Sequence, residues 1–293
     1  MTSIPAIVSQ SIEEIKKSGQ PVTVLGAGGF VGSHLCDYLH RMGISALTPK
    51  KGDDSIFKQP LGYVFYCIGL TADYAARPHD TVEAHSALIS RLLQTDNYHR
   101  LVYLSSTRLY DFANGAGDES ADISMNPANP RHVYDLSKML GEWLCLNASH
   151  AKARVARLAS VYSHDLRDRN FLHQMVERAI SEGDFIVDST ASASRDYVYI
   201  DDVCTALIAI VAQGKQPIYN VASGQNIRND ELFAMIAESG AARITAAKPS
   251  AAADAPIIDI SGLRDDFGLH PVQLRDKMKT IINHNKLLDN GTR

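Results

Sequence analysis

Three glycines spaced three residues apart constrain the fold of this chain more than any other feature. Gly26, Gly29 and Gly32 follow the apolar run Val22–Leu25, and they open a stretch whose apolar positions recur at helical spacing. The first glycine permits a sharp turn, the second lets the backbone approach a ligand, and the third lets the helix pack on the strand. Such a turn presents free N–H groups at a helix N-terminus to an anion. The pattern predicts a site for the pyrophosphate of a dinucleotide.

Further apolar segments extend this unit into a layered α/β fold. Alternation of strands and helices predicts a doubly wound, Rossmann-type parallel sheet, and 293 residues are enough for this domain and a smaller partner. Only residues 49–62 separate the second strand from the third, too few for a full helix and strand. We therefore expect one β-α unit to be missing or compressed into a loop. The strands expected after the first are 45–48, 63–68, 100–104 and 153–158.

Composition and charge narrow the class of protein. The net charge is −4 and no basic stripe with interleaved aromatic residues occurs, so we expect no nucleic-acid partner. The first 20 residues lack the apolar core of a signal peptide, and no apolar run is long enough to span a bilayer. The four cysteines lie far apart without metal-ligand spacing, which favours reduced thiols and no metal site. We expect a soluble, cytoplasmic protein that binds no membrane.

A tyrosine and a lysine four residues apart carry the second chemical signal. Pro130 suits the first turn of a helix, which would put Tyr134 and Lys138 on one helix face. An ammonium near the phenol favours the phenolate, so Tyr134 is a candidate general acid and base. An ordinary helix with a packed tyrosine and a solvated lysine has the same spacing, and the pair alone does not separate the two interpretations.

Hydroxyl side chains follow a buried strand at the position where doubly wound sheets carry their sites. Ser105, Ser106 and Thr107 end the apolar segment that begins at Leu101. The carboxyl ends of parallel strands face the ligand crevice, where a hydroxyl can orient a substrate oxygen. A strand-end cap is the alternative role for the two serines.

Together these motifs resemble the extended short-chain dehydrogenase/reductase family, the NAD(P)-dependent nucleotide-sugar epimerases, dehydratases and reductases. The glycine triplet is the family's Gly-x-x-Gly-x-x-Gly pattern. The family's Ser-Ser-x-x-x-Tyr pattern matches Ser105, Ser106 and Tyr110, and its Tyr-x-x-x-Lys pattern matches Tyr134 and Lys138. The resemblance covers nearly the whole chain, and it implies a Rossmann-type domain with a smaller C-terminal α/β lobe for the substrate.

The resemblance assigns roles to these residues. Ser106 would polarise the substrate oxygen, with Thr107 as the neighbouring alternative, and Tyr134 would transfer the proton. Lys138 would lower the pKa of the tyrosine and hold the ribose hydroxyls of the nicotinamide half, and the hydride transfer is left to the cofactor. The residues expected to bind the cofactor are Gly26, Gly29, Phe30, Val31, Gly32, Lys50, Lys51, Tyr134 and Lys138.

Segments in the second half resemble the family's substrate lobe. Arg195 matches an arginine that contacts the nucleotide diphosphate, and a guanidinium can bind two phosphate oxygens at once. Asn170 matches a phosphate-binding asparagine, and Ser160 replaces the family's asparagine after an arginine. A surface ion pair with Asp196 is the alternative for Arg195, and an ordinary polar loop is the alternative for Asn170. The expected substrate-binding residues are Thr107, Ser160, Asn170 and Arg195.

The resemblance also divides the chain into two domains. We expect a dinucleotide-binding domain over residues 1–162, to which residues 196–221 return. A substrate-binding lobe is expected over residues 163–195 and 222–293. Residues 241–255 are rich in alanine, and we expect them to form a loop or a connection at a domain edge.

Two helices correspond to the seam at which members of the family dimerise. They are expected near residues 81–95 and 131–147. Their leucines serve either this seam or the core of the domain, and we expect a homodimer. The leucines in question are Leu88, Leu92, Leu140 and Leu144.

Three positions depart from the family's pattern. His85 stands in the helix where many members have asparagine, and packing or solvation is a simpler role for it than catalysis. Dehydratases carry an Asp-Glu pair directly after the catalytic hydroxyl, where this chain has Thr107 and Arg108. Arg108 also stands where double epimerase-reductases carry a cysteine base. These departures argue against sugar dehydration and against epimerisation beside a ketone.

The end of the second strand bears on the choice of cofactor. An acidic residue there would bind the adenosine ribose and select NAD, and this chain has no acid before Asp53. Lys50 or Lys51 could neutralise a 2′-phosphate, although loop lysines are solvated in most proteins. NADP is therefore slightly favoured over NAD.

The sequence leaves several functions open. The first two are a nucleotide-sugar epimerase that retains its cofactor and a reductase that consumes NADPH. The others are a reductase of a non-sugar carbonyl and a non-catalytic protein that senses a dinucleotide; the presence of Tyr134 and Lys138 argues against the last. The sugar, the base and the stereochemical outcome depend on the pocket of the variable C-terminal lobe.

Overall fold

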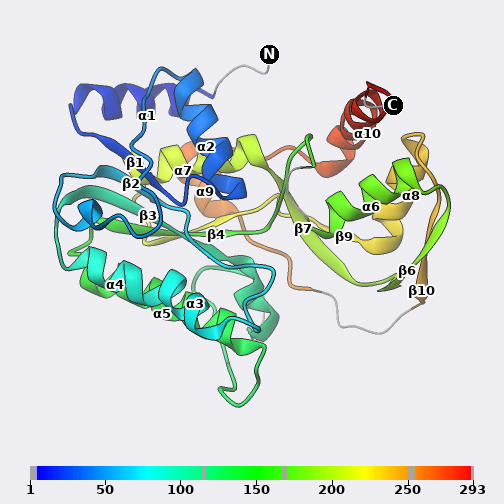
Figure 1. Ribbon diagram of the computed structural model, residues 1–293, viewed down its shortest axis with the longest axis horizontal. Coiled ribbons are helices and arrows are strands. Elements are labelled where there is room, and N and C mark those ends of the chain that lie inside the picture. The colour runs from blue at the N-terminus through cyan, green and yellow to red at the C-terminus, as the bar shows by residue number, and fades with distance from the viewer. Residues whose placement is uncertain (1–4, 114–116, 167–169, 250–254, 292–293) are drawn as a thin grey trace. The chain divides into compact units, whose positions relative to one another are not determined.

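The computed structural model describes residues 5–113, 117–166, 170–249 and 255–291, and the chain divides into two compact units (Figure 1). The first unit comprises the described residues up to Leu158, Val203–Val221 and Asp259–Leu269. The second comprises Ala159–Asp202, Ala222–Ile258 and the described residues from His270 onward. Each unit has its own sheet and its own helices, and each is described by itself.

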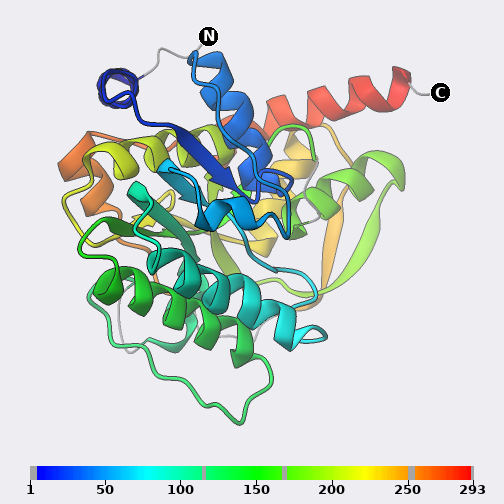
Figure 2. The same cartoon turned by 60° about the vertical axis from the view of Figure 1, so that its left-hand side comes forward.

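A five-stranded parallel sheet forms the centre of the first unit, in the order β1-β2-β3-β4-β8. Its strands are almost continuously buried, as expected where helices cover both faces of a sheet. Figures 1 and 2 show α1, α2, α7 and α9 on one face and α3, α4 and α5 on the other. The predicted Rossmann-type fold is confirmed. The strands are β1 Val22–Leu25, β2 Gly62–Tyr66, β3 Tyr98–Ser106, β4 Ala153–Leu158 and β8 Ile218–Val221.

Amphipathic helices such as α2 and α5 connect these strands and bury one apolar face each, whereas α7 is buried on all sides from Val203 to Ala212. In the described part of the chain no helix combines the length and the apolar character that crossing a membrane requires. Two 3₁₀ turns, η1 Asp54–Phe57 and η3 Thr107–Phe112, and one π-helical turn, η2 Glu83–Ala87, interrupt the connections. The helices are α1 Ala6–Lys17, α2 Phe30–Arg41, α3 Pro78–Val82, α4 Leu88–Leu93, α5 His132–Ala148, α7 Ile200–Gln213 and α9 Ser261–Phe267.

The expected second strand is reduced to a single bridge. Leu47 pairs with Thr23 of β1, and the Leu47 N–H donates to the Val22 carbonyl at 2.7 Å. The strand predicted at 45–48 is therefore wrong beyond this bridge, because Leu47 alone continues the ladder. From there the chain passes through η1 directly into β2. The expected loss of one β-α unit is confirmed.

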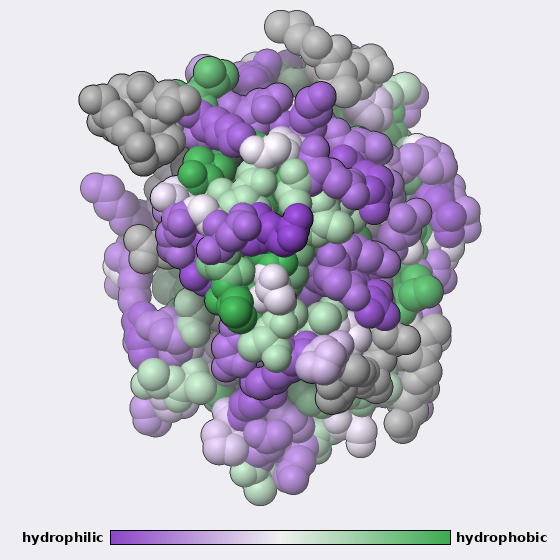
Figure 3. Space-filling model, turned by 90° about the vertical axis from the view of Figure 1, so that its right-hand side faces the viewer, coloured by the Kyte–Doolittle hydropathy of each residue, from purple (hydrophilic) through white to green (hydrophobic). Residues whose placement is uncertain are grey.

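The second unit contains a three-stranded sheet, β5-β7-β9, and a parallel pair, β6-β10. Side chains of α6, α8 and α10 form its core together with Tyr162, Tyr197, Ile227 and Ile244. Figure 3, viewed from the side where these elements are drawn in Figure 1, shows a mainly hydrophilic surface with small apolar areas. The elements are β5 Ser160–Tyr162, α6 Phe171–Ser181, β6 Phe185–Thr190, β7 Ser194–Tyr199, β9 Asn226–Arg228, α8 Asn229–Glu238, β10 Ile244–Lys248 and α10 Leu274–Gly291.

The alanine-rich segment 241–255 contains a strand that the sequence analysis does not predict. β10 pairs with β6, and the Ile244 side chain enters the core of the second unit. The expectation of a loop is therefore wrong for residues 244–248, because backbone pairing and one buried isoleucine outweigh the low strand preference of alanine. Residues 250–254 lie outside the described residues.

The four leucines considered for a dimer seam do not share one environment. Leu92 is fully buried, and Leu88 and Leu144 pack against the same core cluster of the first unit. Leu140 is 50% exposed. Three of the four therefore serve the core, and Leu140 alone among them presents most of its side chain on the surface of α5.

Candidate active site

The glycine turn between β1 and α2 is built so tightly that it requires glycine at two positions. Gly26 has a φ of +86°, and a Cβ there would lie 2.9 Å from the carbonyl carbon of Cys67. A Cβ on Gly32 would lie 2.3 Å from the Gly26 carbonyl oxygen. The first position therefore needs glycine for its backbone conformation and for space, and the other needs it so that α2 can approach the turn.

The same turn ends in the unsatisfied N–H groups of a helix. Gly29 is the N-cap of α2, and Phe30 and Val31 are the first two helical residues. The first N–H groups of a helix have no intrahelical acceptor, so they can bind an anion. A side chain added at Gly28 would meet no atom within 4 Å, which shows that the turn is open on this side. The turn therefore fits the pyrophosphate of a dinucleotide.

Lys50 and Lys51 follow the segment that pairs with β1. Because Leu47 runs parallel to β1, the residues after it lie toward the carboxyl edge of the sheet, where the glycine turn also lies. Both lysines are exposed. Asp53, the first acidic residue after them, caps η1 by accepting a hydrogen bond from the Ser55 N–H at 2.9 Å. Its carboxylate thus has a structural partner.

Ser106 and Thr107 lie where β3 passes into η3. The Ser106 hydroxyl is the N-cap of this turn and accepts a hydrogen bond from the Arg108 N–H at 3.2 Å. The same hydroxyl is near enough to the phenol of Tyr134 to lower its pKa, which places the two predicted catalytic oxygens in one site. Ser106 therefore serves as a cap and as a partner of the tyrosine at once, so the alternative of a strand-end cap is part of the arrangement.

Tyr134 and Lys138 lie on one face of α5, and both side chains are buried. The Lys138 ammonium donates a hydrogen bond to the Leu104 carbonyl at 2.7 Å and lies 5.0 Å from the centre of the Tyr103 ring. Burial lowers the pKa of Lys138 to about 8. A Cβ on Gly69 would lie 3.4 Å from this ammonium, so the absence of a side chain at Gly69 leaves space beside the lysine.

The cation that the structure places against the Tyr134 ring is Arg108. The guanidinium carbon lies 5.0 Å from the centre of that ring and 4.8 Å from the centre of the Tyr74 ring. Burial raises the pKa of Tyr134, whereas the Ser106 hydroxyl and the charge of Arg108 oppose this rise. The sequence analysis expects Lys138 to lower this pKa. Lys138 is not among the groups that shift this pKa in the structure, and burial outweighs the charge of Arg108 because the ring is almost completely enclosed.

His85 is fully buried in the π-helical turn between α3 and α4, and it connects three segments. Its Nε2 accepts a hydrogen bond from the Leu70 N–H at 3.1 Å, and its Nδ1 lies 2.8 Å from the Ser137 hydroxyl. Burial lowers the pKa of His85 to about 3, so the ring is neutral at physiological pH. The ring also meets Tyr134 edge-on, with centroids 5.1 Å apart. His85 is therefore a packing residue that supports the helix of the tyrosine.

In the second unit the start of α6 brings two predicted phosphate ligands together. Asn170 is the N-cap of α6, where its Oδ1 accepts a hydrogen bond from the His173 N–H at 2.9 Å. Its Nδ2 donates to the Val161 carbonyl at 2.7 Å. The Arg195 guanidinium lies 5.0 Å from the centre of the Phe171 ring, next along the chain from Asn170. A positive side chain and a capped helix N-terminus thus share one region.

Asp196 and Ser160 have clear structural positions in the same unit. The Asp196 carboxylate accepts hydrogen bonds from the Ser223 N–H at 2.8 Å and the Gln225 N–H at 3.0 Å. Burial raises its pKa to about 6. Its bonds hold this turn, so the ion pair considered for Arg195 gives way to stacking on Phe171. Ser160 begins β5 and pairs with Tyr197.

Sequence reasoning missed Tyr74 and Asp135 and assigned no role to Arg108. Tyr74 carries no sequence signal, because it lies in an irregular segment between β2 and α3. Two features of the sequence could have pointed to the other two residues. Asp135 is next to Tyr134, and Arg108 stands where dehydratases of the family carry an acid and epimerase-reductases carry a cysteine. The cluster Ser106, Arg108, Tyr134, Asp135 and Lys138 and the glycine turn all lie in the first unit.

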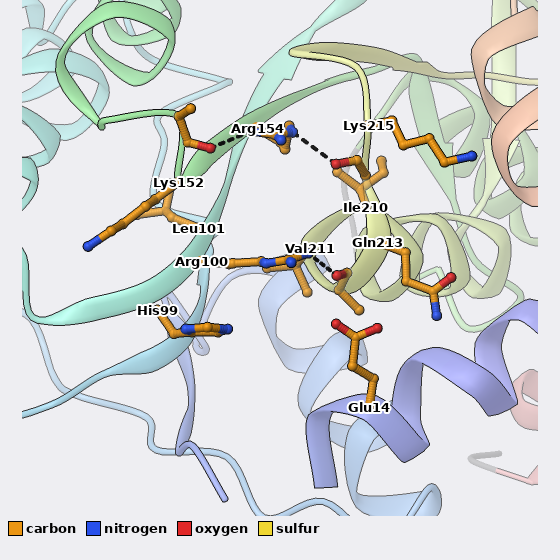
Figure 4. A pocket seen from close by; sticks show the side chains of 13 residues that line it. Glu14, His99, Arg100, Leu101, Lys152, Arg154, Ile210, Val211, Gln213 and Lys215 are labelled. Carbon is orange, nitrogen blue, oxygen red and sulfur yellow. Dashed lines mark hydrogen bonds between the residues drawn. The ribbon is translucent and has the colours of Figure 1, made fainter. Parts of the chain in front are cut away.

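A hollow of the first unit lies at the amino ends of β3 and β4, at the opposite end of β3 from Ser106 (Figure 4). Its volume is about 410 Å³. Arg100 donates to the Ala212 carbonyl, and the Arg154 Nε donates to the Gly214 carbonyl at 3.1 Å. These cations satisfy the last carbonyl groups of α7, a common way to end a helix. The arginines of this hollow are thus accounted for by the fold.

The described residues contain neither a cluster of metal-binding side chains nor a disulfide. No group of three or more His, Cys, Asp or Glu side chains in the described ranges is arranged to hold a metal ion. None of the four cysteines forms a disulfide, and two of them, Cys145 and Cys204, are fully buried. In the described part of the molecule, reactive side chains therefore gather around Tyr134.

Comparisons with known proteins identify what this chain resembles. A family model described as the NAD dependent epimerase/dehydratase family matches residues 22–222. A dTDP-4-dehydro-6-deoxy-D-allose reductase of a Streptomyces species is 24% identical over 305 residues, which cover 88% of this chain and 94% of that protein. The solved structure of MoeE5 in complex with UDP-glucose and NAD superposes with a TM-score of 0.76 at 21% identity, covering 90% of this chain and 97% of that one. RMD from Pseudomonas aeruginosa complexed with NADPH superposes with a TM-score of 0.74 at 22% identity, covering 91% and 99%.

Proposed function

This chain belongs to the NAD dependent epimerase/dehydratase family, and we propose that it is an epimerase or reductase that acts on a sugar carbinol or ketone of a nucleotide sugar. Members of the family are NAD-dependent enzymes of the extended short-chain dehydrogenase/reductase type, and this chain is such an enzyme. The observation that carries the finer proposal is that Arg108 links Ser106 to Tyr134 at the carboxyl end of β3: its N–H donates to the Ser106 hydroxyl at 3.2 Å, and its guanidinium lies over the Tyr134 ring. Two hydroxyl groups there can share one substrate oxygen.

The proposed proton transfer uses the side chains of the first unit. Tyr134 gives a proton to the substrate oxygen when a ketone is reduced, and takes it back when a carbinol is oxidised. Ser106 holds the same oxygen, with Thr107 beside it. The dinucleotide, when bound, supplies or accepts the hydride. Lys138 has three N–H donors and spends one on the Leu104 carbonyl, which leaves two for the ribose hydroxyls of the nicotinamide half.

The proposed cofactor is NADP, with NAD as the alternative. Gly26, Gly29 and Gly32, with the N–H groups of Phe30 and Val31, form the cradle for the pyrophosphate. The exposed Lys50 and Lys51 support a 2′-phosphate, since Asp53 is engaged in capping η1. NADPH is present in one similar solved structure and NAD in another, so the choice rests on the lysines of this chain.

The proposed substrate is a nucleotide sugar whose diphosphate is held by the second unit. Arg195 and the N-terminus of α6 at Asn170 would bind the phosphate oxygens, and Ser160 would contact the sugar or the nucleoside. MoeE5 was solved in complex with UDP-glucose, and the Streptomyces relative is named for a dTDP-linked sugar. Thr107 and Arg108 stand in place of the acids of dehydratases, which disfavours dehydration.

The first experiment separates the two reactions. We would purify the protein without added cofactor, denature it and identify the released dinucleotide by mass. We would then follow the absorbance near 340 nm after adding NADPH and a mixture of nucleotide keto-sugars. Stoichiometric retained NAD without net oxidation of NADPH indicates an epimerase. An empty site that oxidises NADPH only with a keto-sugar nucleotide indicates a reductase, and oxidation with simple carbonyl compounds indicates a non-sugar reductase.

A matched pair of variants tests the role of Tyr134. We expect Tyr134→Phe to lower turnover by about 10²-fold to 10⁴-fold, the usual contribution of a general acid or base. The control is Tyr98→Phe, which removes a buried phenol hydroxyl that has no hydrogen-bond partner among the described residues. Full activity of Tyr134→Phe would overturn the proposal and favour a protein that senses a dinucleotide without catalysis.

We further propose a homodimer and a cytoplasmic location. Leu136, Leu140 and Trp143 form an exposed apolar stripe on α5, at 37%, 50% and 59% exposure. Their spacing of four and three residues puts them on one helix face, which a second copy could cover. The absence of a disulfide among the four cysteines supports a reducing compartment.

A further inference from the structure

Arg108 contacts three residues around the phenol of Tyr134. Its guanidinium lies against two neighbouring aromatic rings, 5.0 Å from the centre of Tyr134 and 4.8 Å from the centre of Tyr74, and the centres of the two rings are 5.3 Å apart. Its Nη2 donates a hydrogen bond to the Tyr74 hydroxyl at 2.8 Å. Its Nε lies 3.3 Å from a carboxylate oxygen of Asp135. These contacts fix a long, flexible side chain in one place.

The backbone of Arg108 adds a link to the catalytic hydroxyl. Its N–H donates to the Ser106 Oγ at 3.2 Å, and that hydroxyl in turn lowers the pKa of Tyr134. The 3₁₀ turn η3 begins directly after Ser106, so the arginine follows the strand end by two residues. The local backbone thus determines that the side chain starts beside the phenol.

Asp135 explains why the arginine is held at this depth. Its side chain is fully inaccessible to solvent, while that of Arg108 is 25% exposed. A buried carboxylate is costly without a partner, and the cation that the structure gives it is Arg108. Asp135 is adjacent to Tyr134 on α5, so the acid draws the guanidinium onto the face of the tyrosine. The arginine cannot move into solvent without stranding this carboxylate.

We propose that Arg108 is a positioning residue whose guanidinium, held against the rings of Tyr74 and Tyr134 and anchored on Asp135, keeps a positive charge against the phenol and stabilises the phenolate. A cation over an aromatic ring is attracted to it, and this attraction is strengthened where water is excluded. A charge within about 4–6 Å changes a pKa by roughly one to three units. The inference rests on the proposed function only in treating Tyr134 as the group that exchanges the proton.

The other groups that face Tyr134 do not supply this charge. His85 meets the ring from η2 and is neutral, because burial lowers its pKa to about 3. Ser106 and Tyr74 contribute neutral hydroxyls from β3 and from the segment after β2. Lys138 lies one turn along α5 and donates to the Leu104 carbonyl. Asp135 opposes the effect of Arg108, because a negative charge favours the protonated phenol.

The test measures the titration of this one tyrosine without any substrate. We would place 3,5-difluorotyrosine at position 134 of the full chain, since fluorine lowers the pKa of a phenol and gives one ¹⁹F resonance. We expect Arg108→Met to raise the pKa of this residue by about one unit. Arg108→Lys, which keeps the charge, should keep it within about half a unit of the parent value.

Asp135→Asn keeps the inference falsifiable even if Arg108→Met folds poorly. In this variant the amide oxygen at position 135 can still accept from the Arg108 Nε, and Nη2 keeps its hydrogen bond to the Tyr74 hydroxyl, so the arginine keeps its place while the opposing negative charge is lost. We therefore expect the pKa of position 134 to fall. A role in packing alone would move the two variants in the same direction or leave both unchanged, and either result overturns the inference. Failure of this titration while Tyr134→Phe abolishes turnover would refute only the inference. An active Tyr134→Phe would refute the proposed function itself.

Discussion

The Glu142 carboxylate accepts hydrogen bonds from the Arg157 guanidinium, at 3.0 Å from Nε and 2.7 Å from Nη2, with both side chains almost fully buried. The pair joins α5, the helix of Tyr134, to β4. Arg157 also donates to the Tyr110 hydroxyl at 2.8 Å, and that hydroxyl donates to Asn220 at 2.7 Å. The network thus connects two strands of the central sheet with the helix that carries the proposed catalytic tyrosine.

Breaking this pair should destabilise the first unit strongly. We expect Glu142→Gln to lower stability by about 3–5 kcal/mol, because it leaves a buried guanidinium without its counter-charge. Thermal unfolding followed by circular dichroism measures the loss. Glu83→Gln, which removes one partner of the exposed Arg91–Glu83 pair, is the control and should cost about 1 kcal/mol or less. Equal effects of the two substitutions would contradict the prediction.

Space at the glycine turn predicts a second difference between two similar substitutions. Gly32→Ala should lower the melting temperature and weaken dinucleotide binding, because its Cβ would lie 2.3 Å from the Gly26 carbonyl oxygen. Gly28→Ala should leave the melting temperature near that of the parent, since a Cβ there meets no atom within 4 Å. Thermal melts and titration with NADH, followed by fluorescence, test both points. A stable, binding-competent Gly32→Ala would refute the close approach of α2.

Acid stability should depend on His85. Its pKa is about 3 in the folded chain and near 6.5 when unfolded, so the unfolded chain binds the extra proton between these values. Stability therefore falls as the pH drops from about 6.5 to about 3. We expect His85→Asn to show a shallower decline of the melting temperature over this window. The exposed His99 offers the control, because His99→Asn should keep the parent's slope.

The lysines after the Leu47 bridge should select the cofactor. Lys50→Ala or Lys51→Ala should weaken NADPH binding by about tenfold and leave NADH binding nearly unchanged, because only NADPH carries the 2′-phosphate. Lys58→Ala, an exposed lysine beyond η1, should change neither affinity. Isothermal titration calorimetry with NADPH and with NADH measures the two affinities of each variant. Parallel losses for NADH and NADPH would show that the lysines do not recognise the phosphate.

The apolar stripe on α5 predicts the oligomeric state. Trp143→Glu should convert a dimer into a monomer at micromolar concentration, because a charge would be buried in the seam. Ile186→Glu, on β6 of the second unit and 70% exposed, is the matched control and should leave the dimer intact. Sedimentation velocity measures both. If the unaltered protein sediments as a monomer, the proposal of a homodimer is wrong.

The sequence by itself determined the fold class, and it predicted the residues of the proposed active site. Glycine adopts backbone angles that other residues avoid and has no side chain, so the triplet Gly26, Gly29 and Gly32 predicts a tight turn from the sequence alone. The same holds for Tyr134 and Lys138, whose spacing defines one helix face. The compressed unit after Leu47 was also predictable, because residues 49–62 are too few for a helix and a strand.

Only the tertiary structure decided which groups surround the tyrosine. Tyr74, Arg108 and Asp135 come from three different segments, and no local pattern predicts that an arginine will lie against two rings and beside a buried acid. The strand at 244–248 and the burial of Leu92 likewise depend on partners distant in sequence. Local spacing fixes the face on which a side chain lies. The charge and the solvent around that side chain are set by the residues that folding brings to it, and these determine its pKa.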